Sequence, residues 1–466
     1  MDANYLTNIR NYPDLYNCTV AVIGLGYVGL PLAVEFSKKN QCQITGKLLS
    51  RRVIGFDTNQ TRIDELKEGF DRTGEISKTE LSKINFSDLT NEISVIANSD
   101  VFVVTVPTPI DEYKKPDLTA LKNACITIAK ALKIRQKTYY EEKDRTIPVI
   151  IFESTVYPGT TEEICIPIIK NELNNFINEK NNNKEFFIYG YSPERINPGD
   201  KKHRLIDIKK VTSGNNNYSA AWIKYFYGSI IKAGIFPAQS IKVAEAAKII
   251  ENTQRDINIA LINELSIIFN LMNIDTLDVI DAASSKWNFI KFKPGLVGGH
   301  CIGVDPYYLT YKSELLGYSP EIVLAGRKIN DGMGKWIAEQ IILEMLKKNI
   351  NNKKPKILIL GFTFKEDCPD IRNTKVVDII KNLKQYNSSI DIVDPLANIK
   401  EVNKTYAIKI LNKIPKNKEY QVIFCAVAHK EFKKLELNDW LSIQKNNGII
   451  FDLKGIVPRE LKPIRF

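Results

Sequence analysis

The sequence predicts an α/β protein in which two doubly wound parallel sheets are joined by a long central helix. Two sets of short, β-branched apolar runs alternate with helical patterns, as the strands of parallel sheets do. The first set lies at residues 19–23, 52–56, 101–106 and 148–152, and the second at 356–360, 390–393, 422–426 and 449–452. From residue 241 onward, apolar residues recur at helical spacing for about thirty positions, which is too long for a crossover helix and suits a connector.

The length of the chain and these patterns predict three domains. A chain of 466 residues suits two or three domains. We expect a cofactor-binding α/β domain at residues 17–215, a central helical domain at 216–330 and a second α/β domain at 331–466. The Asn- and Lys-rich stretch at 347–354 is typical of a linker.

Composition excludes several classes of protein. The formal net charge of +11 favours anionic ligands, but the lysines are scattered and no arginine-rich arm is present, so we expect no nucleic acid. The seven cysteines are dispersed, without CxxC or zinc spacing, which predicts no metal site and a reducing compartment. The polar N-terminus and the lack of about 18 consecutive apolar residues predict a cytoplasmic protein without a membrane span.

A glycine loop follows the first predicted strand and opens a helix. It has the form GxGxxG, with Gly24, Gly26 and Gly29 around Tyr27 and Val28. Such glycines permit a tight turn, close approach of a pyrophosphate and close helix packing, so the loop predicts a Rossmann-like dinucleotide site. The alternative is an ordinary glycine turn.

Asp57 ends the second predicted strand, where a carboxylate accepts hydrogen bonds from ribose hydroxyls and repels a 2′-phosphate. This favours NAD over NADP. The stretch between Gly29 and Asp57 is longer than usual because of a polar insert at residues 41–51. Arg51 and Arg52 in and after this insert slightly weaken the preference for NAD over NADP. Arg62 is expected either over the adenine side of the cofactor or as a solvated helix arginine.

A cysteine surrounded by glycines is the most informative feature of the chain. Four glycines lie within PGLVGGHCIGVDP, residues 294–306, around Cys301, and Asp305 follows four residues later. Small neighbours would keep the thiol accessible, whereas the alternative is a buried structural cysteine. A thiolate can add to an aldehyde, and the resulting thiohemiacetal can lose a second hydride to give a thioester that water cleaves. Cysteine and nicotinamide together therefore suit four-electron oxidation of a primary alcohol.

These motifs together resemble the UDP-glucose/GDP-mannose dehydrogenase superfamily over about residues 17–460. The segments that carry the resemblance are VIGLGYVGLP at 22–31, ESTV at 153–156, YSPERINP at 191–198, AEAAKIIENT at 244–253, GGHCIGVD at 298–305 and GFTFK at 361–365. The resemblance implies an NAD-binding Rossmann domain, a helical dimerisation region and a C-terminal UDP-binding domain. It also implies a UDP-sugar substrate and a homodimer or higher homo-oligomer.

The resemblance assigns catalytic roles to individual residues. Cys301 resembles the nucleophile, and Lys248 the lysine that stabilises an anionic oxygen on C6, assisted by Asn252 one turn later. Asp305 resembles the aspartate that orients water and thiol, and Glu194 the acid/base glutamate of the substrate loop.

Further residues are assigned to the same reaction or to its ligands. Thr155 resembles a water-holding threonine beside the cofactor, and Glu153 is a further acid/base candidate. The cofactor side includes Pro107, Thr108 and Arg372, and the substrate side includes Arg195, Gly298, Arg327 and Lys365. Lys248, Glu194 with Arg195, and Asp305 also have structural interpretations, as a solvated lysine, a surface pair and a turn residue, and His300 is expected to be a packing residue.

The residues around the thiol indicate the sugar. UDP-glucose members of the family carry serine before the cysteine and lysine before the aspartate, where this chain has His300 and Val304. This form, with YSPERINPGD at 191–200, the run at 201–210 and SKWNF at 285–289, resembles the enzymes that make UDP-GlcNAc or UDP-GalNAc uronic acids for surface polysaccharides. UDP-ManNAc and UDP-glucose remain alternatives, as do a two-electron hydroxyacid or polyol-phosphate dehydrogenase and a non-catalytic binding protein.

Overall fold

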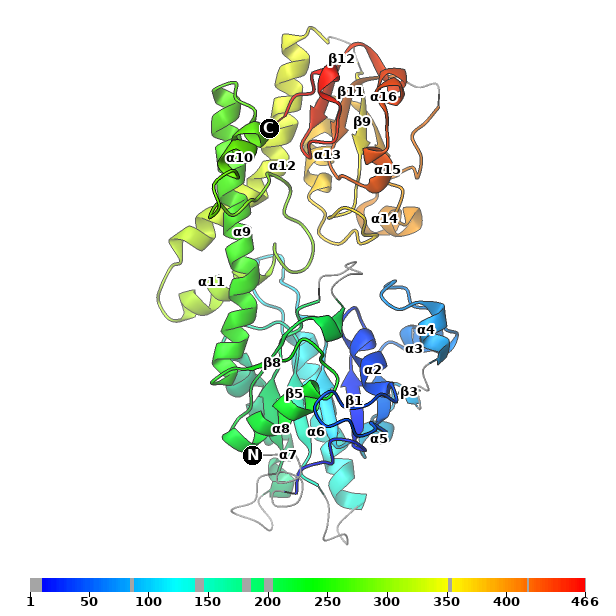
Figure 1. Ribbon diagram of the computed structural model, residues 1–466, viewed down its shortest axis with the longest axis vertical. Coiled ribbons are helices and arrows are strands. Elements are labelled where there is room, and N and C mark those ends of the chain that lie inside the picture. The colour runs from blue at the N-terminus through cyan, green and yellow to red at the C-terminus, as the bar shows by residue number, and fades with distance from the viewer. Residues whose placement is uncertain are drawn as a thin grey trace. The chain divides into compact units, whose positions relative to one another are not determined.

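The computed structural model describes residues 11–83, 88–138, 146–177, 186–196, 204–350, 354–416 and 419–465. The chain forms two compact units (Figure 1). Unit 1 comprises Met1–Ile250 and Tyr307–Lys312, and unit 2 comprises Glu251–Pro306 and Ser313–Phe466. The three-domain division at 215/216 and 330/331 stays a prediction.

Unit 1 is built on a six-stranded parallel sheet of order β3-β2-β1-β4-β5-β6. The strands are β1 (Thr19–Ile23), β2 (Arg52–Phe56), β3 (Asp88–Thr90), β4 (Val101–Val104), β5 (Val149–Phe152) and β6 (Ile188–Tyr191). This is the strand order of a dinucleotide-binding fold, in which ligands bind at the carboxyl ends of the strands, where the order reverses between β1 and β4. The predicted fold class is confirmed for this half of the chain.

Both faces of the first sheet are buried, which explains its continuous apolar strands. In β1, Val20 and Val22 join a core formed with α2, α3 and α8, while Ala21 and Ile23 on the opposite face are buried as well. The helices of unit 1 are α2 (Gly29–Ser37), α3 (Gln60–Lys67), α4 (Lys78–Lys83), α5 (Ile93–Ile96), α6 (Thr119–Thr138), α7 (Ile166–Ile177), preceded by a π-helical turn (Thr161–Cys165), and α8 (Asn217–Gly228).

A small two-stranded parallel sheet completes unit 1. It pairs β7 (Lys210–Thr212) with β8 (Ile235–Pro237), and a short 3-10 helix (Leu205–Asp207) precedes β7. Lys210, the first residue of β7, is buried. This sheet therefore brings a cation into the interior of the unit.

The predicted connector is a single 31-residue helix, α9 (Ile241–Leu271). The division between the units falls inside it, between Ile250 and Glu251. The helices that follow are α10 (Thr276–Ala283), α11 (Asp305–Leu315) and α12 (Glu321–Lys347). α12 reaches the start of the predicted 347–354 linker, of which residues 351–353 lie outside the described part.

Unit 2 contains a second parallel sheet of order β10-β9-β11-β12. Its strands are β9 (Lys356–Leu360), β10 (Ser389–Val393), β11 (Tyr420–Cys425) and β12 (Gln444–Asp452). Its remaining helices are α13 (Val376–Lys384), α14 (Ile399–Tyr406), α15 (Lys430–Lys433), α16 (Leu437–Ile443) and a 3-10 turn (Arg459–Leu461).

Alternating residues of β9 face two different cores. Ile357 and Ile359 pack with α12 and α13, whereas Leu358 and Leu360 pack with α15 and α16. Figure 1 shows these helix pairs on opposite sides of the sheet. Because strand side chains point alternately to the two faces, both must be apolar, and the second doubly wound sheet is confirmed.

Predicted and observed strands differ mainly at their ends. The strand predicted at 101–106 ends at Val104, because the chain then leaves the sheet toward Pro107. The short strands β3, β6, β7 and β8 were not predicted. Their sequences DLT, IYGY, KVT and IFP include polar residues, glycine or proline, whereas the four-residue strands β4 (VFVV) and β5 (VIIF) are continuous apolar runs. Within the described residues, no helix is both long and apolar enough to cross a membrane.

Candidate active site

The glycine loop after β1 is shaped by two close backbone approaches and one open position. Gly24 has φ +95°, and a Cβ on Gly29 would lie 1.8 Å from the Gly24 carbonyl oxygen. Among the described residues, no heavy atom would lie within 4 Å of a Cβ on Gly26. Tyr27 and Val28 are half-buried in the turn, and Val28 caps α2. Gly26 thus leaves the space that a pyrophosphate needs at a helix N-terminus, and the loop fits a dinucleotide.

Asp57 lies directly beside this loop. Its Oδ2 accepts from the Leu25 N–H at 2.9 Å, and its Oδ1 accepts from the Asn59 N–H at 2.9 Å. The half-buried carboxylate therefore follows β2 in the position expected of a ribose-binding acid.

Arg51 and Arg62 are both buried, whereas Arg52, the first residue of β2, is exposed. Arg62 donates through Nε to the Leu25 carbonyl at 2.9 Å and pairs with Asp71 at 2.7 Å, so it supports the glycine loop from inside rather than being solvated. Arg51 donates to the Leu15 carbonyl and lies 4.6 Å from the ring centroid of Phe226. The Arg51 guanidinium is bound within the core and does not compete for a 2′-phosphate, which removes one of the two arginines (Arg51 and Arg52) that weakened the preference for NAD.

The ends of β4 and β5 meet beside the glycine loop. Thr108 Oγ1 donates to the Thr155 carbonyl at 2.7 Å, and Tyr308 OH donates to the Thr108 carbonyl at 2.8 Å. Ser154 Oγ donates to the Val106 carbonyl at 2.6 Å, next to Pro107. Thr108 and Thr155, proposed for the cofactor side, are thus held together.

A buried ionic cluster lies behind this edge. Lys210 Nζ is 2.7 Å from Glu153 Oε2 and 3.4 Å from Glu194 Oε2, and Tyr227 OH donates to Glu153 Oε1. Burial raises the pKa of Glu153 to about 7, with Lys210 opposing and Glu194 adding to the shift. Burial also opposes the charge of Lys210, but the two carboxylates outweigh it and raise the Lys210 pKa.

Glu194 is tied to its own loop as well. Its Oε1 accepts from the Arg195 and Ile196 N–H groups, both at 2.6 Å. The Arg195 side chain donates to the Lys209 carbonyl. The rest of the predicted substrate loop, residues 197–203, lies outside the described residues.

The helix α9 carries the predicted lysine and asparagine four residues apart. Lys248 is 8% exposed. In unit 2, Asn252 Nδ2 donates to Asp305 Oδ2 at 2.6 Å, and Asp305 is the first residue of α11. Its backbone N–H donates to the Cys301 carbonyl at 2.9 Å. The aspartate thus begins a helix rather than an isolated turn, and it joins α9 to the cysteine loop.

Cys301 differs in exposure from the other cysteines. All seven lie within the described residues; six are buried, and Cys301 is half-buried. The preceding glycines let the loop lie flat on the β9–α13 connection. A Cβ on Gly298 would lie 2.7 Å from the Asn373 carbonyl oxygen, and one on Gly299, whose φ is +79°, would lie 2.8 Å from the Phe364 ring.

A buried polar network holds the same loop to the helices of unit 2. Asn263 exchanges two hydrogen bonds with the backbone of Gly295, and its Nδ2 also donates to Asn330 Oδ1. Asn330 donates to Asp256, whose Oδ1 also pairs with Arg327 at 2.6 Å. Arg327, predicted on the substrate side, is therefore 2% exposed and joined to the network.

His300 and Arg372 lie near one another in unit 2. Burial, together with the charge of Arg372, lowers the pKa of His300 to about 4. The Arg372 guanidinium binds both carboxylate oxygens of Asp370, at 2.6–3.0 Å. At neutral pH, His300 is uncharged, which agrees with the predicted packing role.

Lysines gather at the carboxyl ends of the second sheet. A small cavity is lined by Lys365, Lys375 and Lys454 together with Gly298 of the cysteine loop. Burial lowers the pKa of the Lys454 ammonium, and an anion placed beside it would favour its charged form. The predicted Lys365 and Gly298 of the cysteine loop therefore line the same cavity of unit 2.

The glycine loop of the second sheet carries its own internal anion. The Phe362 and Thr363 N–H groups donate to Asp394 Oδ2 at 2.7 and 3.0 Å, and His429 Nε2 lies 3.0 Å from the same oxygen. Although burial opposes ionisation, these hydrogen bonds lower the pKa of Asp394 to about 2. Asp394 thus accepts the backbone N–H groups of this loop. The corresponding N–H groups in the loop after β1 are the ones that a phosphate would use.

Several of these groups were missed by sequence reasoning. Lys210, Tyr227 and Lys454 give no local signal, because their importance comes from burial beside distant partners. Asp394 could have been found, since it ends its strand as Asp57 does. In the described part of the chain, no cluster of three or more His, Cys, Asp or Glu residues could hold a metal.

Comparison with known proteins gives matches along almost the entire chain. Residues 18–231, 242–332 and 358–459 match, in order, the NAD binding, central and UDP binding domains of the UDP-glucose/GDP-mannose dehydrogenase family. A UDP-N-acetyl-D-glucosamine 6-dehydrogenase of Salmonella typhi is 50% identical over 446 residues, which cover 96% of this chain and 98% of that protein. One of Pseudomonas aeruginosa is 49% identical, with 96% and 99% covered. The solved UDP-D-ManNAc dehydrogenase of Pyrococcus horikoshii has a TM-score of 0.78 at 25% identity, with 94% and 96% covered.

Proposed function

The chain belongs to the UDP-glucose/GDP-mannose dehydrogenase family, and from that premise we propose that it oxidises C6 of a UDP-N-acetylhexosamine to a carboxylate with NAD. One alcohol, two NAD⁺ and one water give one carboxylate, two NADH and three protons. The observation that supports this most is the half-buried thiol of Cys301 in a glycine loop, while the other six cysteines are buried.

The thiol is proposed to act after the first oxidation. NAD, when bound, accepts the hydride from C6 in each oxidation. The Cys301 thiolate adds to the aldehyde carbon, a C–S bond forms, and loss of the second hydride leaves a thioester. Water then cleaves the C–S bond and returns the thiol. Asp305, fixed by Asn252 and by the Cys301 carbonyl, orients the thiol and the water.

The oxygen on C6 needs a cation and a base. Lys248, with Asn252 one turn later on α9, is proposed to stabilise the negative charge that develops on this oxygen. Glu194 accepts the alcohol proton or activates water through its less constrained Oε2, and Thr155 holds that water. Glu153 remains the further acid/base candidate in this scheme.

The chain's own residues are proposed to hold NAD in unit 1. The Gly24 N–H donates to the Phe56 carbonyl, so Gly24 shapes the turn, while the N–H groups of Gly26, Tyr27, Val28 and Gly29 are proposed to face the pyrophosphate. Asp57 is proposed to accept from the ribose hydroxyls. Pro107, Thr108 and Thr155 line the path toward the nicotinamide. Arg62 supports the loop from within, and Arg372 is proposed on the cofactor side. These assignments rest on the open space at Gly26 and the carboxylate at the end of β2.

The UDP moiety is proposed to bind to lysines of unit 2. Lys365 and Lys454 line the same cavity, and a diphosphate there would offset the burial of the Lys454 ammonium. Gly298 lets the cysteine loop approach this surface closely. Arg195 and Arg327 are proposed on the substrate side, the latter through the loop around Gly303, where an added Cβ would lie 4.0 Å from Arg327 Nη2.

Among sugars, UDP-GlcNAc is the first candidate and UDP-GalNAc the second. Two relatives that are about half identical over nearly their whole length are named UDP-N-acetyl-D-glucosamine 6-dehydrogenases. His300 and Val304 agree with an acetamido sugar rather than glucose. We further propose that the uronic acid is made in the cytoplasm for surface polysaccharide.

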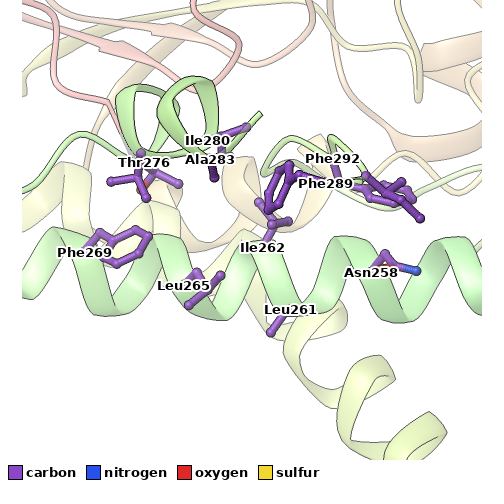
Figure 2. Close-up of a pocket in the computed structure, with 12 residues that line it drawn as sticks. Asn258, Leu261, Ile262, Leu265, Phe269, Thr276, Ile280, Ala283, Phe289 and Phe292 are labelled. Carbon is purple, nitrogen blue, oxygen red and sulfur yellow. The ribbon is translucent and has the colours of Figure 1, made fainter. Parts of the chain in front are cut away.

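The same resemblance, and an exposed apolar surface, support a homodimer. An apolar cavity of about 260 Å³ lies between α9, α10 and the segment at 289–292, lined by side chains such as Leu261, Leu265, Phe289 and Phe292 (Figure 2). Trp287 and Ile290 nearby are 92% and 68% exposed. A second copy of the chain is the proposed occupant, because such apolar surface is costly to leave in water.

The test is a set of parallel assays with UDP-GlcNAc, UDP-GalNAc, UDP-ManNAc and UDP-glucose. We expect two NADH per sugar and the highest kcat/KM with UDP-GlcNAc or UDP-GalNAc. Cys301→Ala should make little or no uronate, while the control Cys42→Ala, which removes a buried thiol, should retain the two-to-one ratio. One NADH per sugar with release of free aldehyde, or full activity of Cys301→Ser, would instead indicate a two-electron dehydrogenase.

A further inference from the structure

The buried cation beside Glu194 has no role in the scheme above. Lys210 is 2% exposed, and its partners Glu153 and Glu194 are 1% and 7% exposed. A lysine is almost never so buried unless its ammonium is paired. Burying three ionisable groups together costs free energy, which indicates that the cluster has a function.

The two carboxylates of the cluster are held very differently. Glu153 accepts from Lys210 on one oxygen and from Tyr227 on the other, so both oxygens point into the protein. Glu194 has its Oε1 fixed by two backbone N–H groups, while Oε2 lies 3.4 Å from Lys210 and makes the longer contact. Glu194 Oε2 is thus the carboxylate oxygen that retains capacity for a proton from substrate or water.

Aromatic rings and Glu153 hold the Lys210 ammonium in place. The Lys210 Nζ lies 5.2 Å from the centroid of the Tyr227 ring, which packs at 5.4 Å and 5.9 Å against Phe226 and Phe36. This wall of rings and the short contact to Glu153 leave the ammonium little freedom to move. The position of the charge beside Glu194 is thereby set by β5, β7 and α8.

We propose that Lys210 is a positioning residue that orients Glu194 Oε2 for proton transfer, and that Glu153 serves as the buried partner that anchors Lys210. Glu153 then acts on the reaction through Lys210, rather than as an acid or base that touches the substrate. This inference rests on the proposed function, since it deepens the role of Glu194 in the same site.

The pH dependence of turnover distinguishes this role from a merely structural one. Lys210 from β7, Glu153 directly after β5 and Tyr227 from α8 are titratable groups that face Glu194. A carboxylate that loses its neighbouring cation is protonated more readily. Without the ammonium 3.4 Å from the Glu194 Oε2, the acidic limb of the pH profile of turnover should move to higher pH.

The experiment compares Lys210→Met with Lys209→Met, a neighbouring exposed lysine. For Lys210→Met we expect kcat to fall at least tenfold and the acidic limb of its pH profile to move up by about one unit. The KM for NAD should stay within twofold, because the glycine loop is separate from the cluster. Lys209→Met should retain the unmodified profile. A folded Lys210→Met protein with unchanged kcat and an unchanged acidic limb would overturn the inference.

Two further variants keep the result interpretable. If Lys210→Met does not fold, Lys210→Met/Glu153→Gln removes one charge of each sign and leaves the net charge of the cluster unchanged. It should show the same upward movement of the acidic limb, and a profile identical to that of the unmodified protein would contradict the proposal. Glu194→Gln distinguishes the inference about Lys210 from the proposed role of Glu194. If Glu194→Gln loses activity while Lys210→Met keeps the activity and pH profile of the unmodified protein, only the inference about Lys210 is refuted. Full activity of Glu194→Gln refutes the role of Glu194, and the inference with it.

Discussion

At the scale of single residues, burial separates groups that hold the structure from groups that can react. Glu245 on α9 is fully buried and accepts hydrogen bonds from the Gly159 and Thr161 N–H groups, at 2.6 and 2.9 Å. Burial nevertheless raises its pKa from 4.5 to about 7. Glu245 therefore links α9 to the turn after β5, and its ionisation lowers the stability of the folded protein.

This gives a prediction for stability against pH. A carboxyl group with a higher pKa in the folded state binds its proton more tightly there, so its contribution to stability is present at low pH and is lost as pH rises from about 4.5 to about 7. Glu245→Gln cannot titrate, and its stability should fall less steeply in that window, by roughly 2 to 3 kcal/mol in total. Thermal unfolding midpoints at pH 5, 6, 7 and 8 measure this. An exposed control, Glu460→Gln, should follow the unmodified protein, and an equal slope for Glu245→Gln would refute the assignment.

The glycine loop gives a second prediction at this scale, since its glycines are needed for different reasons. A methyl group on Gly29 meets the Gly24 carbonyl at 1.8 Å, whereas a methyl group on Gly26 meets no described heavy atom within 4 Å. Gly29→Ala should lower the free energy of unfolding by about 1 to 3 kcal/mol. Gly26→Ala should leave stability of the cofactor-free protein unchanged but weaken NAD binding at least tenfold, because the methyl group fills the space of the pyrophosphate. Calorimetry of unfolding and of NAD binding would separate the two, and tight NAD binding by Gly26→Ala would contradict the proposed cofactor site.

At the scale of elements, the two sheets use the same turn for different purposes. Gly24 and Gly361 both have φ +95°, and each donates its N–H to the last residue of the neighbouring strand. Asp57, which follows β2, is half-buried and accepts one hydrogen bond from a backbone N–H of its loop. Asp394, which follows β10, is fully buried, accepts two such hydrogen bonds and also lies beside His429. The loop after β1 can therefore still bind an anionic ligand, whereas the loop after β9 already binds the Asp394 carboxylate.

The cysteine loop depends on helices α9 and α12, and this predicts the effect of a buried asparagine. Asn263→Leu would leave the Gly295 N–H and carbonyl groups without their partner, at a cost of about 2 to 3 kcal/mol. Uronate formation should fall more than tenfold as the loop around Cys301 loosens, while the affinity for NAD stays the same. Urea unfolding, product analysis and NAD titration check this.

The matched control for that experiment is Asn258→Leu on the same helix. Its amide donates to the Gln254 carbonyl of α9 itself, so the substitution should cost little. Equal effects of the two substitutions, or a normal product yield from Asn263→Leu, would show that the network does not position the loop.

At the scale of the whole molecule, the proposed dimer depends on apolar side chains that a monomer leaves exposed. Leu261 on α9, labelled in Figure 2, and Ile290 both line the apolar cavity. They are 52% and 68% exposed. Leu261→Glu/Ile290→Glu should weaken association at least tenfold by placing two charges in an apolar interface. Light scattering at micromolar concentration should then give a mass near 53.0 kDa rather than twice that value. Tyr386→Glu, at an exposed position after α13, is the control, and an unchanged mass of the double variant would exclude this surface.

The sequence by itself determined the features that are local. The alternation of strands and helices, the turn at Gly24–Gly29, the acid after β2 and the 31-residue helix α9 follow from periodicity and turn chemistry over a few neighbouring residues. The glycines around Cys301 predicted an accessible thiol, but not the close contact of Gly298 and Gly299 with Asn373 and Phe364. Family resemblance then supplied the roles of side chains such as Lys248 and Lys365.

The tertiary structure decided which polar groups are buried and with whom they pair. Lys210 lies 57 residues from Glu153 along the chain, and Tyr227 lies 74 residues from it, so no local pattern encodes their cluster. The same holds for the link from Asn263 to Gly295 and for the burial of Arg62 beneath the glycine loop. Burial and pairing arise when distant segments pack together, and only that packing fixes the charge and the pKa of a group such as Glu153.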